Sequence, residues 1–237
     1  MFFHLSLVGA VLVGLVLGLA RPVAAEYVAI DLHPAGFAFS IAHGVSGDQQ
    51  VGRGQVTIGR EHALLWSGSA ANIVDLQPLG FIDSAAFAVS GGQQVGRGIA
   101  PGQGNHALLW SGSAASVVDL HPPGFLSSLA VGISGDQQVG SGLKDGHGHA
   151  LLWSGSAASV VDLNPFLPPG FTDASATSID ANGNIVGQAF SFATGNHAFL
   201  WQPVAVAEPG SLALVSLGVA GLSVLRLRRH PKKWRYS

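Results

Sequence analysis

The chain has 237 residues, of which 48% are hydrophobic and 10% charged, with 33 glycines and no cysteine. The lack of cysteine excludes disulfides and thiolate metal sites, and abundant glycine with few charges favours a β protein with many tight turns. Residues 26–207 hold four basic and twelve acidic side chains, a net charge of −8. Such an acidic body would repel phosphate backbones, so nucleic-acid binding is not expected.

Residues 1–25 have the pattern of a secretory signal peptide. Leu5–Ala20 is a nearly unbroken apolar run, and Val23–Ala25 places small residues at the spacing that signal peptidase cleaves. No lysine or arginine precedes the apolar run, so an uncleaved anchor is the alternative. The segment predicts an apolar N-terminal helix that directs export and is removed after Ala25.

Residues 26–203 contain four copies of a unit of about 44 residues, which indicates a repeat architecture. The phrases HALLW or HAFLW, the motif Asp-Leu-x-Pro and a Gly-Phe pair recur in register. The side chains assigned to this structural repeat are His62, His106, His149 and His197, Trp66, Trp110, Trp153 and Trp201, and Asp31, Asp75, Asp119 and Asp162.

Each unit holds four short strand-like segments, which in the second unit are NIVDL, SAAFAVS, QQVGRGI and HALLW. Four strands in this length is the size of a propeller blade. The nearly continuous apolar runs indicate sheets that are covered on both faces. The sequence therefore predicts an all-β, β-propeller-like domain of four blades. A half-ring that dimerises and a stack of sheets would show the same period.

The two ends of the repeat region complement each other. The first three repeat histidines are each followed 13 residues later by an aspartate, whereas Gly210 stands in that place after His197, and Asp31 has no histidine before it. We expect each histidine to hydrogen-bond the aspartate of its own blade. We also expect Tyr27–Leu32 to close the ring as the last strand of the blade that ends at Trp201.

These units resemble the HAF-repeat family of extracellular proteins, named for a His-Ala-Phe core. Gly195–Trp201 reads GNHAFLW, SIDANGNIVG precedes it, and the three HALLW copies differ by leucine for phenylalanine. The resemblance covers about 175 residues. It implies a secreted, propeller-like repeat protein, and the family carries no defined biochemical activity.

The repeated side chains are interpreted as structural, with no metal site and no cofactor. A metal ion needs three or four close ligands, whereas the histidines stand one per blade. Large rings at strand ends fill the space between blades, an interpretation that covers the tryptophans and Phe37, Phe81, Phe125 and Phe171. Asp180–Asn184 has the oxygen spacing of a calcium loop but lacks the distal glutamate, so a β-turn is favoured.

No catalytic residue is assigned, because nucleophile-elbow and zinc-protease motifs are absent. An active site also needs different chemical groups at one point, whereas near-identical units place the same group at several equivalent points. The units differ most in residues 55–61, 99–105, 143–148 and 189–196 and in the connections after Asp-Leu. In an up-and-down blade both sets emerge on one face, where variable loops on a rigid scaffold bind ligands. The candidate binding residues are Arg60, Glu61, Asn105, Lys144, Asp145, His147 and Asn196.

Residues 204–237 have the pattern of a membrane-sorting segment, with a transmembrane helix expected over 210–227. Gly210–Leu225 is apolar and would reach about 24 Å as a helix, and RLRRHPKKWR follows it, which favours a cytoplasmic tail. The segment resembles a PEP-CTERM sorting signal through Glu208, Pro209, Arg226, Arg228 and Arg229, with Ala207 in place of the first proline. The resemblance implies transient anchoring in the inner membrane of a Gram-negative bacterium and processing by an exosortase-type protease.

Together these patterns predict an exported, non-enzymatic repeat protein of the cell surface or extracellular polysaccharide matrix. It is expected to bind glycan or protein through the variable loops. The alternative is a secreted propeller-type hydrolase that acts on polysaccharide or peptide.

Overall fold

The computed structural model describes residues 27–57 and 59–204. The chain divides into two compact units, Met1–Asp31 and Leu32–Ser237. Residues 27–31 contain no helix or strand, and every element described below belongs to the second unit. The apolar helices expected at both termini fall outside the described residues.

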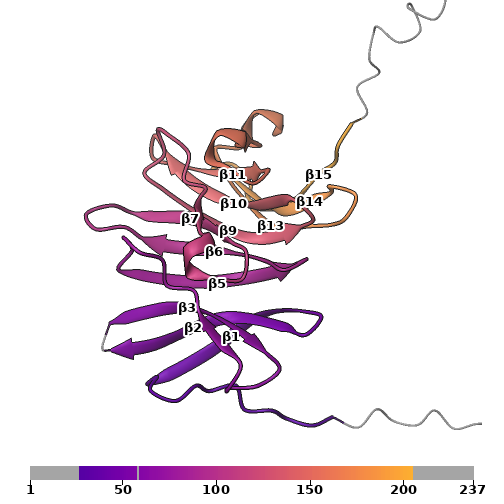
Figure 1. The fold of residues 1–237 in the computed structure, drawn as a ribbon. Coiled ribbons are helices and arrows are strands. Elements are labelled where there is room, and N and C mark those ends of the chain that lie inside the picture. The colour runs from indigo at the N-terminus through magenta and orange to yellow at the C-terminus, as the bar shows by residue number, and fades with distance from the viewer. Residues whose placement is uncertain (1–26, 58, 205–237) are drawn as a thin grey trace, which may run out of the picture. The chain divides into compact units, whose positions relative to one another are not determined.

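The described part of the second unit is all-β, as predicted, and contains four antiparallel sheets that follow one another along the chain (Figure 1). The first sheet contains β1 (Phe39–Ser46), β2 (Gln49–Thr57), β3 (Arg60–Ser67) and β4 (Ile73–Asp75). The second contains β5 (Asp83–Ser90), β6 (Gln93–Ile99), β7 (Asn105–Trp110) and β8 (Val118–Asp119). The third contains β9 (Ser127–Ser134), β10 (Gln137–Lys144), β11 (His147–Trp153) and β12 (Val161–Asp162). The fourth contains β13 (Asp173–Ile179), β14 (Ile185–Ser191) and β15 (Gly195–Trp201).

Three short 3-10 helices lie in the connections: η1 (Ala114–Ser116), η2 (Ala157–Ser159) and η3 (Asn164–Phe166). Each of the first three sheets takes its last strand from the Asp-Leu motif that follows its HALLW strand. This is the strand order that the spacing between each histidine and its aspartate predicts.

The same steric constraint requires a glycine at the end of the QQVG segment in the first three sheets and of NIVG in the fourth. A Cβ at Gly52 would lie 1.9 Å from the carbonyl oxygen of Ile41, and the glycines at Gly96, Gly140 and Gly187 face their own first strands at 1.9–2.0 Å. The pairing register shifts beside these positions, which marks a β-bulge in each first strand. Only glycine allows the bulged backbone to approach this closely.

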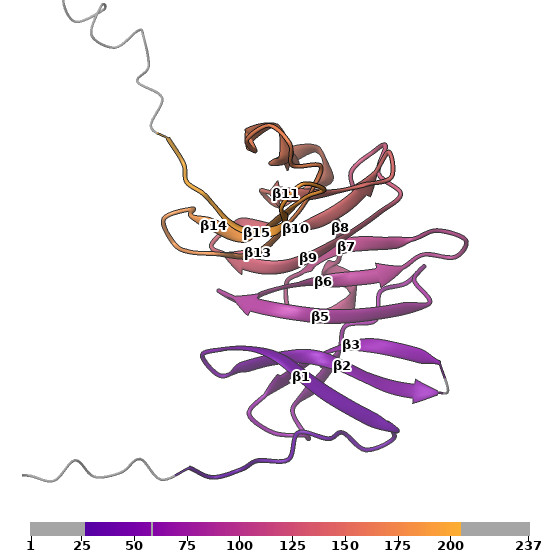
Figure 2. The ribbon, with the colours of Figure 1, turned by 180° about the vertical axis from the view of Figure 1, so that it is seen from behind.

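The sheets are stacked face to face in chain order (Figures 1 and 2). Extensive contacts join β2 and β3 to β5, β6 and β7 to β9, and β10 and β11 to β13, and the first strands β1, β5, β9 and β13 also contact one another in succession. Three apolar clusters fill the interfaces, each with a tryptophan that ends a third strand: Trp110, Trp153 and Trp201. The second and third sheets are therefore covered on both faces, as predicted.

The prediction that Tyr27–Leu32 closes a ring is wrong for this structure. The fourth sheet has three strands, and residues 27–34 form no helix or strand. Closure would require the first and fourth sheets to meet, but within the described chain the extensive contacts run only between sheets that are neighbours in sequence. The four sheets form an open stack, and within residues 27–57 and 59–204 no further sheet covers the outer face of the first or of the fourth.

Candidate functional site

The variable loops emerge on one face of the stack, as predicted. Because the strands of each sheet alternate in direction, the hairpin between the second and third strands lies at the same end as the connection to the next sheet. We call this end the loop face (residues 55–57, 59–61, 76–82, 99–105, 120–126, 143–148, 163–172 and 189–196). The opposite end is the turn face (residues 47–48, 68–72, 91–92, 111–117, 135–136, 154–160 and 180–184).

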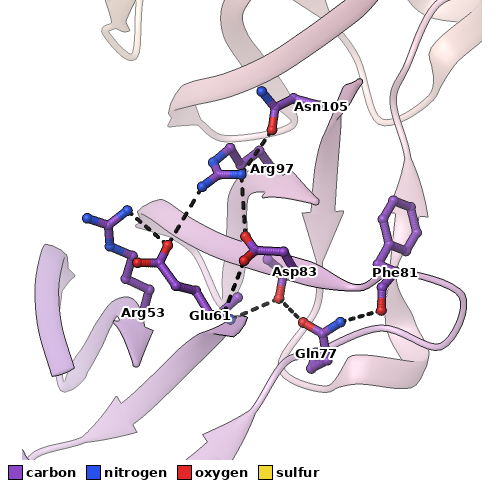
Figure 3. A network of polar contacts seen from close by, with 9 residues as sticks. Arg53, Glu61, Gln77, Phe81, Asp83, Arg97 and Asn105 are labelled. Carbon is purple, nitrogen blue, oxygen red and sulfur yellow. Dashed lines mark hydrogen bonds and ion pairs between the residues drawn. The ribbon is translucent and has the colours of Figure 1, made fainter. Parts of the chain in front are cut away.

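Four charged side chains join the first and second sheets at the loop-face end (Figure 3). Arg53 Nη1 lies 3.1 Å from Glu61 Oε2, and Arg97 Nη2 approaches the same oxygen at 3.7 Å. Arg97 Nη1 lies 3.4 Å from Asp83 Oδ1, and the Glu61 backbone N–H donates to Asp83 Oδ2 at 3.1 Å. The two cations and two anions neutralise one another in a half-buried setting.

Two residues that the sequence analysis assigned to binding belong to this cluster. Glu61 lies between both arginines, and Asn105 Oδ1 accepts a hydrogen bond of 2.9 Å from Arg97 Nη1 (Figure 3). Both side chains therefore hold neighbouring strands and sheets together. This role leaves the adjacent Arg60, which is exposed, as the charged group of its hairpin that faces solvent.

An equivalent contact joins the third and fourth sheets through Asp173. Its carboxylate accepts hydrogen bonds from the Gly148 backbone N–H at 2.8 Å and from Thr172 Oγ1 at 2.7 Å, and His147 Nδ1 lies 3.3 Å away. These contacts, the Gly148 bond foremost, lower the pKa of Asp173 below its usual value. The aspartate is therefore held as an anion, and the predicted binding residue His147 faces it.

The hairpin between β10 and β11 presents two more of the predicted residues. Asp145 is exposed and adopts a φ of 52°, a left-handed conformation that aspartate tolerates better than most residues. Lys144 extends its ammonium group over the Phe125 ring, 5.6 Å from the ring centre, which is a cation–π distance. The hairpin thus carries a positive and a negative charge at the loop face.

Asn196, the last predicted binding residue, borders a small hollow of about 130 Å³ on the fourth sheet. Asp173, Ser175, Gln188 and Phe190 also line this hollow. The hollow offers a carboxylate, a hydroxyl and two amides beside one aromatic ring. That combination can hydrogen-bond a hydroxylated ligand and stack on it.

Large apolar side chains distinguish the loop face from the turn face. Leu79, Leu126 and Phe192 are 66–100% exposed in loops of the loop face. Among the turn-face residues named above no large hydrophobic side chain is exposed, although Val204, which follows β15 at the same end, is 82% exposed. The three exposed side chains of the loop face give it apolar groups that a partner could cover.

The repeated histidines make the hydrogen bonds that their spacing predicted. The Nδ1 atoms of His62, His106 and His149 lie 2.7–2.8 Å from Oδ2 of Asp75, Asp119 and Asp162. Each pair connects a third strand to the fourth strand of the same sheet. Among residues 27–57 and 59–204, no group of three or more histidine, aspartate or glutamate side chains is placed to hold a metal ion.

The repeated aromatic side chains are buried to different degrees. The four tryptophans are at least nine-tenths buried in the stack, as the core interpretation predicted. The four phenylalanines of the Gly-Phe pairs are half-buried. Three of them contact the repeat histidine of their own sheet edge-on, as Phe81 contacts His106 with ring centroids 6.0 Å apart. They also cover a strand glycine such as Gly98, and His106 is buried beside Phe81 whereas His197 stays exposed beside Phe171.

A hydrogen-bond relay between adjacent sheets escaped the sequence analysis. The buried Ala63 N–H donates to Ser84 Oγ at 2.9 Å, and that hydroxyl donates to Gln77 Oε1 at 2.5 Å. Gln77 Nε2 then donates to the Phe81 carbonyl at 2.6 Å (Figure 3). The available signal was a serine that recurs at Ser40, Ser84 and Ser128 with the period of 44 residues.

The second and third sheets repeat this relay with histidine in place of glutamine. The Ala107 N–H donates to Ser128 Oγ at 2.9 Å, and Ser128 Oγ lies 2.8 Å from His121 Nδ1. His121 Nε2 lies 3.1 Å from the Phe125 carbonyl and donates to it, so Nδ1 accepts from the serine hydroxyl. Burial and the neighbouring His106 lower the pKa of His121, which favours this neutral form.

The segment with calcium-loop spacing forms a turn held by the side chain of Asp180. Asp180 Oδ1 accepts hydrogen bonds from the backbone N–H groups of Asn182 and Asn184, and Asp180 Oδ2 accepts one from the Asn184 side chain. These bonds, those from Asn184 foremost, lower the pKa of Asp180. The carboxylate thus stabilises the turn that the sequence favoured.

The signal-peptide residues 1–25 and the sorting-motif residues Glu208, Pro209, Arg226, Arg228 and Arg229 lie outside the described residues. Within residues 27–57 and 59–204, no helix has the length and apolar character that a membrane crossing requires. No protein-family model and no curated protein matches the chain.

Proposed function

We propose that the protein is an exported repeat protein that binds a glycan or a protein through its loop face, without catalysing a reaction. The observation that carries this proposal is the asymmetry between the two ends of the stack. The loop face varies from sheet to sheet and exposes Leu79, Leu126 and Phe192, whereas the turn face repeats the same short turns. A scaffold that fixes one end and varies the other is typical of binding proteins.

The polar groups near the loop face also favour binding over catalysis. Arg53, Glu61, Asp83 and Arg97 neutralise one another, and Asp173 is held by backbone and side-chain donors. Their bonds lie within and between sheets, so they stiffen the scaffold beneath the loops. The groups that remain directed to solvent, such as Arg60 and Asp145, come from different hairpins.

The cellular setting is part of the same proposal. The N-terminal pattern, the HAF-type repeats and the PEP-CTERM-like segment together support export, transient anchoring in the inner membrane and residence at the cell surface or in the polysaccharide matrix. Signal peptidase and an exosortase-type protease would act on the two ends. We also propose that the four sheets are blades of a propeller-like repeat, because each is an up-and-down antiparallel sheet stacked on the next.

Two loop-face substitutions and one turn-face control test the binding proposal. Asp145 and Asp136 are both exposed aspartates of the third sheet, one at the loop face and one at the turn face. The full-length chain should be retained on immobilised members of a polysaccharide and protein panel. Asp145→Asn, combined with Phe192→Ala, should weaken retention, and Asp136→Asn should not change it.

Equal effects of the loop-face and turn-face variants would show that the loop face is not the binding surface. Release of shortened polysaccharide or peptide would instead establish the alternative, a secreted hydrolase. Absence of retention on every member of the panel would count against a glycan or protein ligand.

A further inference from the structure

The fourth sheet lacks a strand that the other three sheets possess. In those sheets a leucine N–H donates to an alanine carbonyl of the third strand: Leu76 to Ala63, Leu120 to Ala107 and Leu163 to Ala150, at 2.8–2.9 Å. The alanine at the same position of β15 is Ala198, which is exposed, whereas the other three are fully buried. No strand of the described chain pairs with the outer edge of β15.

The residues that would complete this edge stand at the beginning of the repeat region. Leu32 precedes Leu76 by one repeat of 44 residues, and Ser40 precedes Ser84 by the same distance. Tyr27–Leu32 reads YVAIDL, which matches the fourth-strand segments NIVDL and SVVDL. Ala63 accepts the N–H of Leu76 at its carbonyl and donates its own N–H to Ser84. By the repeat period, the corresponding partners of Ala198 are Leu32 and Ser40.

These counterparts cannot reach Ala198 within the same stack. Ser40 lies in β1 of the first sheet, and Ala198 lies in β15 of the fourth, with two complete sheets between them. Face-to-face sheets are spaced by about 10 Å, so three spacings separate the two residues. The groups would meet only if the first sheet of another molecule were placed on the fourth sheet.

The two uncovered faces have the apolar character of the internal interfaces. Val186 of β14 is 45% exposed, whereas the valines that precede the QQVG-type glycine in the other sheets, Val51, Val95 and Val139, are fully buried. On the first sheet Val45 is 70% exposed, and its counterpart Val89 in the second sheet is 7% exposed. Each face therefore displays the side chains that are buried when one sheet covers the next.

An apolar hollow marks the position of the missing strand. Leu152, Leu163, Leu200 and Trp201 are among the residues that line a space of about 490 Å³ beside β15. At the two preceding interfaces the corresponding clusters are covered by Val117 and Val160, which stand two residues before the aspartate of a fourth strand. The residue two before Asp31 is Ala29, with Val28 beside it.

We propose that a second copy of this chain completes the fourth sheet. Its Tyr27–Leu32 segment pairs with β15 as a fourth strand, and its first sheet covers the fourth sheet. This is β-strand addition to an exposed edge, and it extends across two molecules the contact that the chain makes three times internally. Because the contact joins unlike surfaces, it produces either a closed ring of copies or a head-to-tail filament.

Cysteine cross-linking tests this proposal, since the natural chain has no cysteine. In the third sheet Leu152 and Val161 are direct cross-strand partners, and the corresponding residues of the proposed pair are Leu200 and Ile30. Both are more than half exposed, so Leu200→Cys and Ile30→Cys should leave the fold intact. Cross-strand partners are close enough for a disulfide after small adjustments.

The two substitutions are placed in separate full-length chains that carry different tags and are co-expressed. Mild oxidation should give a covalent product that contains both tags, and Val186→Asp in the Leu200→Cys chain should abolish it. Leu152→Cys with Val161→Cys in one chain is the control, and it should give an internal disulfide without dimer.

Three results would overturn the proposal. The first is an internal disulfide when Ile30→Cys and Leu200→Cys are placed in one chain, with no product between differently tagged chains, because the segment would then complete its own sheet. The second is absence of any disulfide at this pair while the control pair forms its own. The third is a covalent product that joins only like cysteines, 30 to 30 or 200 to 200.

Discussion

The serine of the inter-sheet relay gives the sharpest test of the packing. Ser128 is 1% exposed, and its hydroxyl accepts the N–H of the fully buried Ala107 while it contacts His121. Ser128→Ala removes both partners but leaves the backbone and the apolar packing unchanged. The Ala107 N–H would then be buried without an acceptor, since β8 pairs with the neighbouring residues Leu108 and Leu109.

The expected cost follows from these two bonds. A buried donor without a partner costs about 1–3 kcal/mol, and the loss of the bond to His121 adds about 1 kcal/mol. We therefore expect the free energy of unfolding to fall by about 2–4 kcal/mol. For a domain of this size 1 kcal/mol corresponds to about 2–4 °C in the midpoint temperature, so the fall should be at least about 4 °C.

Guanidinium unfolding of the full-length chain, followed by tryptophan fluorescence, measures the global effect. Hydrogen exchange of the Ala107 amide measures the local one, and its exchange should accelerate more than that of the Ala63 amide, which keeps its serine acceptor. The exposed Ser46 provides the control, because Ser46→Ala should change stability by less than about 0.5 kcal/mol. An equally small change for Ser128→Ala, with unaltered Ala107 exchange, would refute the relay as a source of stability.

Three further substitutions probe other parts of the stack. Trp110→Ala should lower the free energy of unfolding by about 3–5 kcal/mol, because it empties a fully buried position between the first and second sheets; chemical denaturation measures it. Gly96→Ala should cost about 3 kcal/mol, because its Cβ would lie 1.9 Å from the Ala85 carbonyl oxygen, whereas Gly148→Ala meets its nearest atom at 3.4 Å and should be nearly neutral. The lowered pKa of His121 means that the unfolded chain binds a proton more readily than the folded chain, so stability should fall as pH decreases below about 6.5; unfolding free energies at two pH values should show a smaller difference for His121→Gln.

The repeat and its strand order could be predicted because the sequence repeats both the pattern and the chemistry. The spacing between His106 and Asp119 predicted a bond that the structure contains at 2.8 Å. It also predicted that the fourth strand of each sheet comes from the next Asp-Leu motif. Burial of Trp66, Trp110 and Trp153 followed from their position at the ends of apolar strands.

Ring closure could not be predicted in the same way, because a repeat pattern specifies each interface but not the rotation from one sheet to the next. The pattern predicts which surfaces are complementary, and Ala198 with Leu32 illustrates this. It does not predict whether the successive rotations bring the fourth sheet back into contact with the first. The charged cluster was missed for a related reason: Arg53, Glu61 and Arg97 come from two sheets, and their proximity depends on how those sheets are stacked.

The residue two positions after the aspartate of each Asp-Leu motif shows how this repeat tolerates sequence variation at the loop face. His33, Gln77, His121 and Asn164 occupy this position in turn. Gln77 and His121 offer an acceptor to a serine hydroxyl and a donor to a backbone carbonyl, and Asn164 instead accepts directly from the Ala150 N–H at 3.0 Å. Three different side chains therefore help to satisfy the backbone hydrogen-bonding groups at the edge of a third strand. Because the backbone groups impose the requirement and several polar side chains can meet it, the loop face can change its residues while the interfaces beneath it keep their geometry.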